Sequence, residues 1–151
     1  MSATFIVPEE VIREEAARDG VTHFVTGIAI IRDGKVLVVR RVANDFLGGF
    51  YELPGGGVDP GEAFAEGAIR ETFEETGLKV SAIVGMFASF DYATKTKPKV
   101  RQINFIVEVE PGVVTLEPTE HDALLWIGPE DIAGLHTTDE MRTCLRAIFA
   151  R

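Results

Sequence analysis

The segment from residue 55 to 78, GGGVDPGEAFAEGAIRETFEETGL, constrains the fold of this chain more than any other. Its tetrapeptide Asp59–Glu62 has the form of a capping box. In this pattern the aspartate caps free amides, the proline takes the first helical position and the glutamate reaches back to the cap. Gly77 can adopt the left-handed conformation that ends a helix. We therefore predict a helix from Pro60 to Thr76.

The predicted helix has two chemically different sides. At about 100° per residue, the side suited to packing on a sheet carries Ala65, Ala68, Ile69, Thr72, Phe73 and Thr76. Glu71, Glu74 and Glu75 gather on the opposite side, where their i, i+3, i+4 spacing brings like charges together. Arg70 can neutralise only part of this charge. The acidic side could be a solvated surface, or it could hold a hard divalent cation, because Mg²⁺ prefers oxygen ligands.

Three glycines precede the helix, and Gly55–Gly57 would let the backbone approach a ligand or metal closely. Together the glycines and the helix match the pattern G-x5-E-x7-R-E-U-x-E-E-x-G-U, in which U is apolar. The matching residues are Gly56, Glu62, Arg70, Glu71, Thr72, Glu74, Glu75, Gly77 and Leu78. Residues 56–78 thus resemble the Nudix box. Thr72 departs from the usual aliphatic residue, but it lies on the packing side and so affects packing rather than chemistry.

The rest of the chain alternates between strand and helix patterns. We expect a helix over 8–19, strands over 21–32 and 35–42 joined by a turn at Asp33–Gly34, strands over 80–92, 100–110, 113–116 and 123–127, a helical turn over 129–132 and a helix over 139–150. Strands interspersed with a central and a terminal helix predict an α/β fold with a mixed sheet covered on both sides.

The resemblance to Nudix proteins implies the same architecture, an α/β/α sandwich, from about Val21 to the end of the sequence. The length fits one domain over 1–151, with the N-terminal helix of residues 1–20 peripheral to it.

Nudix enzymes cleave a diphosphate linkage by attack of water on phosphorus, usually with Mg²⁺ or Mn²⁺. The resemblance makes Glu74 and Glu75 metal ligands and Glu71 a ligand or the base that orients the water. It adds the carbonyl of Gly55 as a further ligand and Arg70 as the residue that holds the glutamates. Nudix proteins often add a loop carboxylate before a late strand, and Glu120 is our first choice, with Glu117 second.

Several other residues are candidates for substrate contact. The resemblance implies an arginine near the end of the strand over 35–42 that faces phosphates, with Arg40 preferred over Arg41. It also places Gly56 and Glu62 at the substrate-binding loop. Lys95, Lys97, Lys99 and Arg101 fit either a solvated hairpin tip or a loop that reaches the phosphates. Candidates for stacking on a base, or for the core, are Phe46, Phe50, Tyr51, Phe87, Phe90 and Trp126.

Composition limits the partners. With 15 basic and 24 acidic residues the net charge is −9, so the chain is poorly suited to long nucleic acid, and we expect a small nucleotide substrate. We expect no membrane partner, because no apolar stretch is long enough to span a bilayer. The single cysteine, Cys144, fits a reducing compartment and a cytoplasmic location. Dimers are common among Nudix proteins, so a homodimer is possible.

Three functions remain open. The first is a MutT-like nucleoside triphosphate pyrophosphohydrolase. The second is a pyrophosphatase for ADP-ribose or a nucleotide sugar. The third is a nucleotide sensor that binds without cleaving, although such domains often lose acids of the box and this chain keeps them all.

Overall fold

The computed structural model describes residues 6–150. In chain order the elements are α1 (Glu9–Arg18), β1 (His23–Arg32), β2 (Lys35–Arg41), β3 (Tyr51–Glu52), β4 (Gly55–Gly57), α2 (Phe64–Thr76), β5 (Val80–Tyr92), β6 (Val100–Val109), β7 (His121–Ile127), the 3₁₀ helix η1 (Pro129–Gly134) and α3 (Asp139–Phe149). No helix among these residues is long and apolar enough to cross a membrane.

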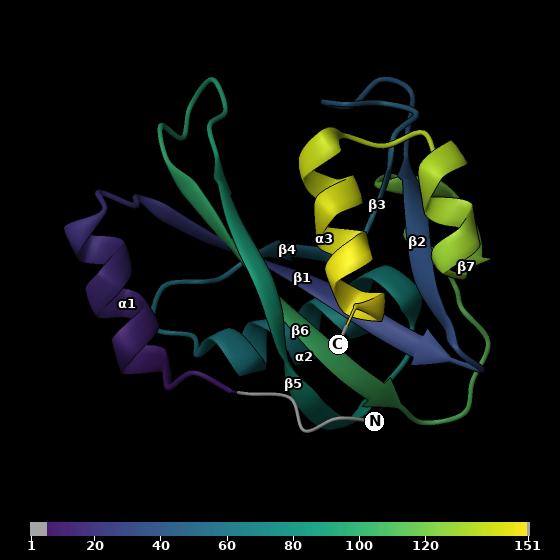
Figure 1. Cartoon of the computed structure of the whole chain (residues 1–151), viewed down its shortest axis with the longest axis horizontal. Helices are drawn as coiled ribbons and strands as arrows, with labels where there is room; N and C mark the ends of the chain where they lie inside the picture. Colours follow the sequence, from purple (N-terminus) through teal and green to yellow (C-terminus); the bar gives the residue numbers. More distant parts are fainter. Residues whose placement is uncertain (1–5, 151) are drawn as a thin grey trace.

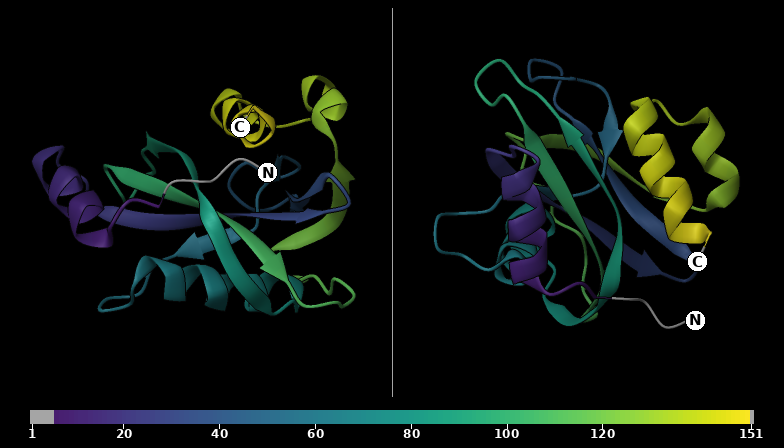
Figure 2. Two further views of the ribbon diagram at one scale, coloured as in Figure 1. Left: turned by 60° about the horizontal axis from the view of Figure 1, so that its bottom comes forward. Right: turned by 60° about the vertical axis from the view of Figure 1, so that its left-hand side comes forward.

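The strands form one seven-stranded mixed sheet. Its order is β3-β2-β1-β6-β5, with β4 paired to β1 and β7 paired to β2. The β1–β6 pair is parallel, and the other pairs are antiparallel. Helix α3 lies on one face of the sheet and α2 on the other (Figures 1 and 2). The predicted α/β/α sandwich is therefore confirmed.

The sheet opens into two parts beyond the first hairpin. Strands β1 and β2 pair only next to their turn, at Ile31–Val36 and Arg32–Lys35. Farther along, β1 pairs with β4 and β2 pairs with β3 and β7. The chain crosses between the two parts directly after β3, and the carbonyl of Pro54 accepts a hydrogen bond from the amide of Ile28 at 2.8 Å. This crossing delivers the glycine run to the side of β1.

Alternating residues of the central strands fill the core on both faces. Ile28 and Ile30 of β1 belong to the cluster that also holds Phe64 and Ala68 of α2. Ala29, between the two isoleucines, belongs to the cluster that α3 covers. This period of two is the geometry of a strand buried on both faces, and it fixes α2 firmly against β1.

Helix α2 starts at Phe64, so the predicted start at Pro60 is wrong. Gly61 has a φ of +79°, which a right-handed helix cannot contain. The capping pattern instead closes a turn, in which the Glu62 amide donates to the Asp59 carbonyl at 3.0 Å and the Asp59 amide donates to Glu62 Oε1 at 2.9 Å. The left-handed Gly77 ends the helix as predicted.

Candidate active site

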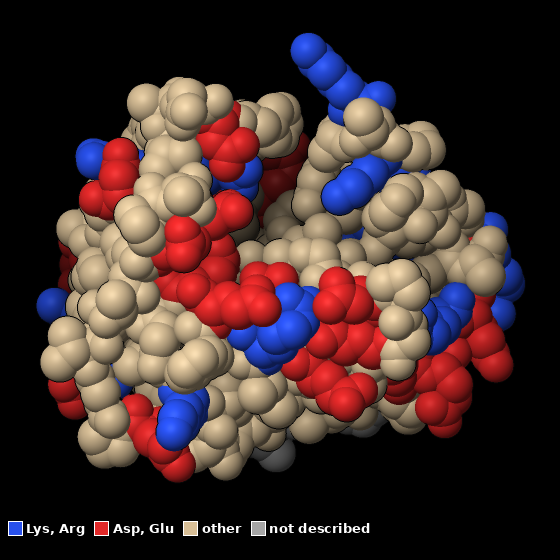
Figure 3. Space-filling view, turned by 180° about the vertical axis from the view of Figure 1, so that it is seen from behind, with Lys and Arg blue, Asp and Glu red and all other residues tan. Residues whose placement is uncertain are grey.

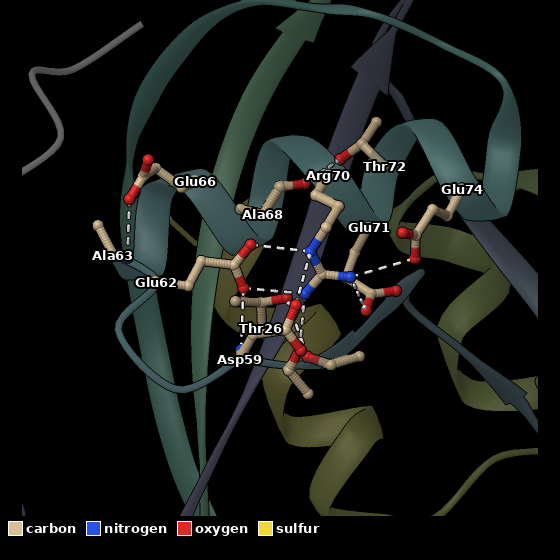
Figure 4. Close-up of polar contacts among 12 residues, drawn as sticks. Thr26, Asp59, Glu62, Ala63, Glu66, Ala68, Arg70, Glu71, Thr72 and Glu74 are labelled. Atoms are coloured by element: carbon tan, nitrogen blue, oxygen red, sulfur yellow. Dashed lines mark hydrogen bonds and ion pairs between the residues drawn. The ribbon is translucent and has the colours of Figure 1, made fainter.

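Arg70 is the centre of the polar site on α2 (Figure 4). Its Nε and Nη2 donate to the Glu62 carboxylate at 2.8 and 2.9 Å, and its Nη1 donates to Glu71 at 2.9 Å and Glu74 at 3.1 Å. Nη2 also donates to the carbonyl of Gly57 at 2.9 Å. The arginine lowers the pKa of Glu62 to about 2. One guanidinium therefore ties the turn before the helix to two of the three clustered acids.

Glu71 lies against the glycine run. A Cβ added to Gly56 would lie 2.5 Å from the carboxyl carbon of Glu71, so only glycine allows this approach. Thr26 of β1 holds Gly56 as well, because its hydroxyl donates to the Gly56 carbonyl at 3.3 Å. Burial raises the pKa of Glu71 despite the bond from Arg70. The site thus holds a partly desolvated carboxylate close to backbone.

Glu75 is the most buried acid of the site, with 5% of its surface exposed. Its Oε1 accepts from the amide of Gly55 at 2.6 Å, and its Oε2 lies 3.4 Å from Nδ1 of His121. Loss of solvation is the main cause that raises the pKa of Glu75 to about 7, and the negative charges of Glu52 and Glu71 add to the effect.

The burial of Glu75 differs from the two-sided helix we predicted. Ile69 and Phe73, expected to pack on the sheet, are 45% and 54% exposed. The buried residues of α2 are Phe64, Gly67, Ala68, Thr72, Glu75 and Thr76. Helix α2 is therefore turned about its axis relative to the prediction. This turn brings Glu71 and Glu75 toward the sheet and leaves Glu74 at the surface.

Glu52 is a site residue that the sequence analysis missed. It lies at the end of β3, where both carboxylate oxygens accept from Nη1 of Arg41, at 3.1 and 3.0 Å. Nε2 of His121 lies 2.9 Å from Glu52 Oε2. The signal in the sequence was a lone acid in the apolar stretch Phe50–Pro54, directly before the glycines.

His121 is 2% exposed and lies between Glu52 and Glu75. The neighbouring carboxylates raise its pKa against the opposing effect of burial. Its Nδ1 is the one buried side-chain nitrogen or oxygen that lacks a hydrogen-bond partner within residues 6–150. His121 therefore joins Glu52 of β3 to Glu75 of α2.

The two loop acids that we predicted as further metal ligands, Glu120 and Glu117, have different surroundings. Glu120 lies at the surface directly before β7, close enough to Arg41 for its charge to add to those of Glu52 and Asp45. Its carbonyl accepts from the amide of Val42 at 3.1 Å. Glu117 accepts from the amide and the hydroxyl of Thr119 at 3.1 and 2.6 Å, so this carboxylate closes its own turn. Glu120 is thus a loop acid that lies near a cavity residue, Arg41.

A cavity of about 310 Å³ opens beside Glu52 and Arg41. Four of the six aromatic residues proposed for stacking line it, namely Phe46, Phe50, Tyr51 and Phe90, together with Tyr92. The ring of Phe50 stacks on His136, with centroids 4.2 Å apart. The cavity has aromatic walls and a few polar groups. This lining and the size of the cavity suit a small planar ligand.

Arg41, rather than the preferred Arg40, lines this cavity. Arg41 pairs with Glu52 and, at 2.8 Å, with Asp45, and its Nε donates to the carbonyl of Phe46. Arg40 is paired with Asp122 at 2.8 Å on the surface. The difference follows from the alternation of strand residues between two faces.

The basic residues of the β5–β6 hairpin do not line the cavity, and two of them contact the end of α1 instead. Arg101 pairs with Asp91 at 2.7 Å and with Asp19 at 3.0 Å. Nζ of Lys99 donates to the carbonyl of Asp19 at 2.6 Å. Thr94, at the start of the hairpin loop, lines the cavity, whereas none of the basic residues does so. These contacts tie Lys99 and Arg101 to the end of α1.

Acidic side chains gather on the face that lies behind the view of Figure 1, with basic side chains among them (Figure 3). Within residues 6–150, no group of three or more His, Cys, Asp or Glu side chains is already arranged around a point where a metal would sit. The contacts explain why, since Arg70 lies between Glu71 and Glu74 while Glu75 turns to Gly55 and His121.

Comparisons with known proteins agree with this geometry. A family model described as NUDIX domain matches residues 21–148. The CTP pyrophosphohydrolase of Escherichia coli is 32% identical over 107 residues, which cover 71% of this chain and 76% of that protein. The bis(5'-nucleosyl)-tetraphosphatase of Rattus norvegicus is 36% identical over 97 residues, 62% of this chain and 65% of that protein.

Solved structures share the fold. The crystal structure of a MutT NUDIX hydrolase from Burkholderia pseudomallei superposes with a TM-score of 0.73 and 26% sequence identity, covering 83% of this chain and 97% of that one. The solution structure of the E. coli ORF135 protein gives a TM-score of 0.72 and 27% identity, covering 85% and 89%. The names of these two solved structures mention no substrate, whereas the names of the two curated relatives refer to different nucleotides.

Proposed function

Because the chain belongs to the Nudix family, we propose that it is a pyrophosphohydrolase that cleaves a diphosphate linkage in a nucleoside diphosphate derivative. The observation that carries this proposal is the arrangement of Glu71 and Glu75 beside the glycine backbone, where both carboxylates are desolvated. The names of the relatives support a nucleotide substrate but differ on which one.

The acids fit a divalent cation, Mg²⁺ or Mn²⁺. Burial is the main cause that raises the pKa of Glu71 and Glu75, and nearby acids add to it. Arg70 is the cation paired with this donor set, and it neutralises only part of the charge. We assign Glu71, Glu74, Glu75 and the carbonyl of Gly55 to the ion, with Glu120 as an outer candidate. A bound ion would screen phosphate charge and make water a better nucleophile.

The chain's own residues prepare the site for attack. Arg70 holds Glu71 and Glu74 in place through Nη1. The raised pKa of Glu71 suits a base that takes a proton from water. The water oxygen then bonds to phosphorus while the bond from phosphorus to the leaving phosphate oxygen breaks. Glu62 holds Arg70 in turn, which makes it part of the loop that frames the substrate.

The cavity supports a nucleoside triphosphate as the first choice of substrate, cleaved to a monophosphate and pyrophosphate. Its aromatic walls offer stacking surfaces for a base, and Arg41 supplies positive charge at its edge. The free, buried Cys144 supports a reducing location such as the cytoplasm. We also propose that the protein forms a homodimer, and gel filtration would test this by measuring its apparent mass.

Product analysis tests the function. The protein is incubated with Mg²⁺ and dGTP, 8-oxo-dGTP, ADP-ribose, a dinucleoside tetraphosphate or a nucleotide sugar, and the products are separated by chromatography. Monophosphate and pyrophosphate from the triphosphates would support the first choice. Cleavage of ADP-ribose or the nucleotide sugar alone would move the substrate to the second choice.

A double variant tests the site. Changing Glu74 and Glu75 to glutamine keeps side-chain size but removes two carboxylates, so turnover should be lost while the circular dichroism spectrum is unchanged. Full activity in this variant would refute the assignment. Tight nucleotide binding by the wild type with Mg²⁺ and without products would indicate a sensor instead.

A further inference from the structure

Helix α1 lies outside the stretch that matches the NUDIX domain, which begins at residue 21. It stands at one end of the sheet (Figure 2). Ile12 and Ala16 anchor it in the core. Its polar contacts are more unusual, because they go to the turn that leads into α2, the helix that carries the acids of the site.

The carboxylate of Glu9 caps α2 from another helix. Its Oε1 accepts from the amide of Phe64, the first residue of α2, at 2.7 Å. Helix starts leave such amides without partners, and a side-chain oxygen at the cap position usually satisfies one of them. Here the cap residue is Ala63, which has no side-chain oxygen. Glu9 therefore supplies a bond that the cap residue cannot make, and it adds its negative charge to that of Glu66 in the first turn of α2.

Arg13 fixes the same turn at further points. Its Nε donates to Glu9 Oε2 at 2.9 Å, and its Nη2 donates to the carbonyl of Glu62 at 3.2 Å. Its guanidinium carbon lies 4.4 Å from the ring centroid of Phe64 and 5.3 Å from that of Phe24. A guanidinium within about 6 Å of an aromatic face is attracted to it. The backbone of residues 62–64 is thus held from α1 on both sides of the cap.

These contacts reach the acids of the site in two steps. The Glu62 carboxylate receives two bonds from Arg70, and Arg70 bonds Glu71 and Glu74. A shift of the turn would therefore move Glu62, then the guanidinium, then the two acids. We infer that α1 is a positioning element of the metal site, in which Glu9 and Arg13 set the geometry of Glu71 and Glu74. This inference rests on the proposed metal-dependent hydrolysis.

Metal affinity separates this role from that of a helix that merely covers the core. A covering helix would change the unfolding temperature when it is damaged, whereas the folded protein would still bind metal normally. A positioning helix changes the affinity for metal in the folded protein. The inference predicts weaker metal binding and a lower kcat at subsaturating Mg²⁺, with the KM for nucleotide unchanged.

The experiment measures Mn²⁺ binding to the full chain by electron paramagnetic resonance without nucleotide. The variants are Glu9→Ala, Glu9→Gln and Arg13→Met. Glu10→Ala is the matched control, because Glu10 lies in the same turn and its side chain has no hydrogen bond or ion pair among the described residues. Circular dichroism verifies that each variant is folded at the temperature of the titration.

We expect Glu9→Ala to weaken Mn²⁺ binding by up to about fivefold, the factor obtained when the whole free energy of one lost cap is lost from metal binding. Arg13→Met should weaken it by a similar factor. Glu9→Gln keeps an oxygen for the Phe64 amide and should restore most of the affinity, while Glu10→Ala should match the wild type. The same order should appear in the Mg²⁺ concentration that half-activates turnover.

Three different results would overturn the inference. If Glu9→Ala and Arg13→Met lower the unfolding temperature but bind Mn²⁺ as the wild type does, α1 only stabilises the fold. If the wild type itself binds no Mn²⁺, the proposed metal-dependent function fails as well. An equal loss of affinity in Glu10→Ala would show a general effect of charge and would also contradict the role of Glu9.

Discussion

The buried carboxylate of Glu75 should make the metal-free protein less stable at high pH. Its pKa is raised from 4.5 to about 7, chiefly by loss of solvation. Below about pH 4.5 the group is neutral in both the folded and the unfolded chain. As the pH rises from about 4.5 to about 7, the group ionises in the unfolded chain but stays protonated in the folded state, so the stability present at low pH is lost over this range and is fully lost above about pH 7. At about 1.4 kcal/mol per pKa unit, the shift corresponds to about 3 kcal/mol.

The variant Glu75→Gln removes this titration and keeps an oxygen that can accept from the Gly55 amide. In a chelating buffer its free energy of unfolding should equal that of the wild type below about pH 4. Near about pH 8 it should be larger by up to about 3 kcal/mol, or about 6–12 °C in unfolding midpoint. Urea and thermal unfolding at several pH values measure the difference.

Glu74→Gln is the matched control, because the Glu74 side chain lies on the same helix and is 54% exposed. Its difference from the wild type should change little with pH. If the difference between Glu75→Gln and the wild type is also constant across this range, Glu75 is not desolvated and the reasoning fails. Added Mg²⁺ should stabilise the wild type more at high pH than at low pH, since it binds the ionised carboxylate.

Three further predictions concern neighbouring groups. Gly56→Ala should lower kcat/KM at least about 100-fold, because the new Cβ would displace the Glu71 carboxylate; a normal circular dichroism spectrum would show that the fold survives, and unchanged kinetics would contradict the close contact. Arg41→Met should cost about 1–3 kcal/mol in urea unfolding, because it leaves the half-buried Glu52 without its cation. Phe50→Leu should raise the KM for a nucleoside triphosphate about tenfold without changing inhibition by inorganic triphosphate, since only the nucleoside has a base to stack.

The large elements could be predicted from local sequence. Strand β5 has the predicted bounds, Val80–Tyr92, and the first hairpin turns at Asp33 and Gly34, both of which have positive φ. A long run of alternating apolar and polar residues favours a strand, and a two-residue Asp-Gly turn favours a hairpin, whatever the rest of the chain does. The parallel pairing of β1 with β6 had no such local signal.

The short elements could not be predicted. Strands β3 and β4 contain two and three residues, and β4 consists of glycines alone, which do not favour strands. They pair because the diverging β1 and β2 leave edges free. Residues 113–116 show the opposite error, because we predicted a strand there and the structure has none. That segment is held by a bond from the Thr115 amide to the Thr76 carbonyl instead of by a neighbouring strand.

The clustered acids of the site were visible in the sequence, but their surroundings were not. Counting residues around α2 placed Ile69 and Phe73 against the sheet, whereas in the structure both are exposed and Glu75 is buried, where it accepts from the Gly55 amide. Glu52 and His121 are far apart in sequence and meet only because β3 and β7 both pair with β2. Such partners depend on the sheet and leave little trace in the local pattern.

The parallel pairing of β1 with β6 also sets an order of events during synthesis. β1 bonds to β6 from His23 with Val100 to Ile30 with Val107, so its neighbour emerges from the ribosome only after the whole of α2 and β5. Until then Ile28, Ile30 and Phe64 have no complete cover. Contacts between distant segments form slowly, because a long loop must close first. We therefore expect the apolar residues of β1 to stay exposed until β6 has left the ribosome, which raises the risk of aggregation during translation.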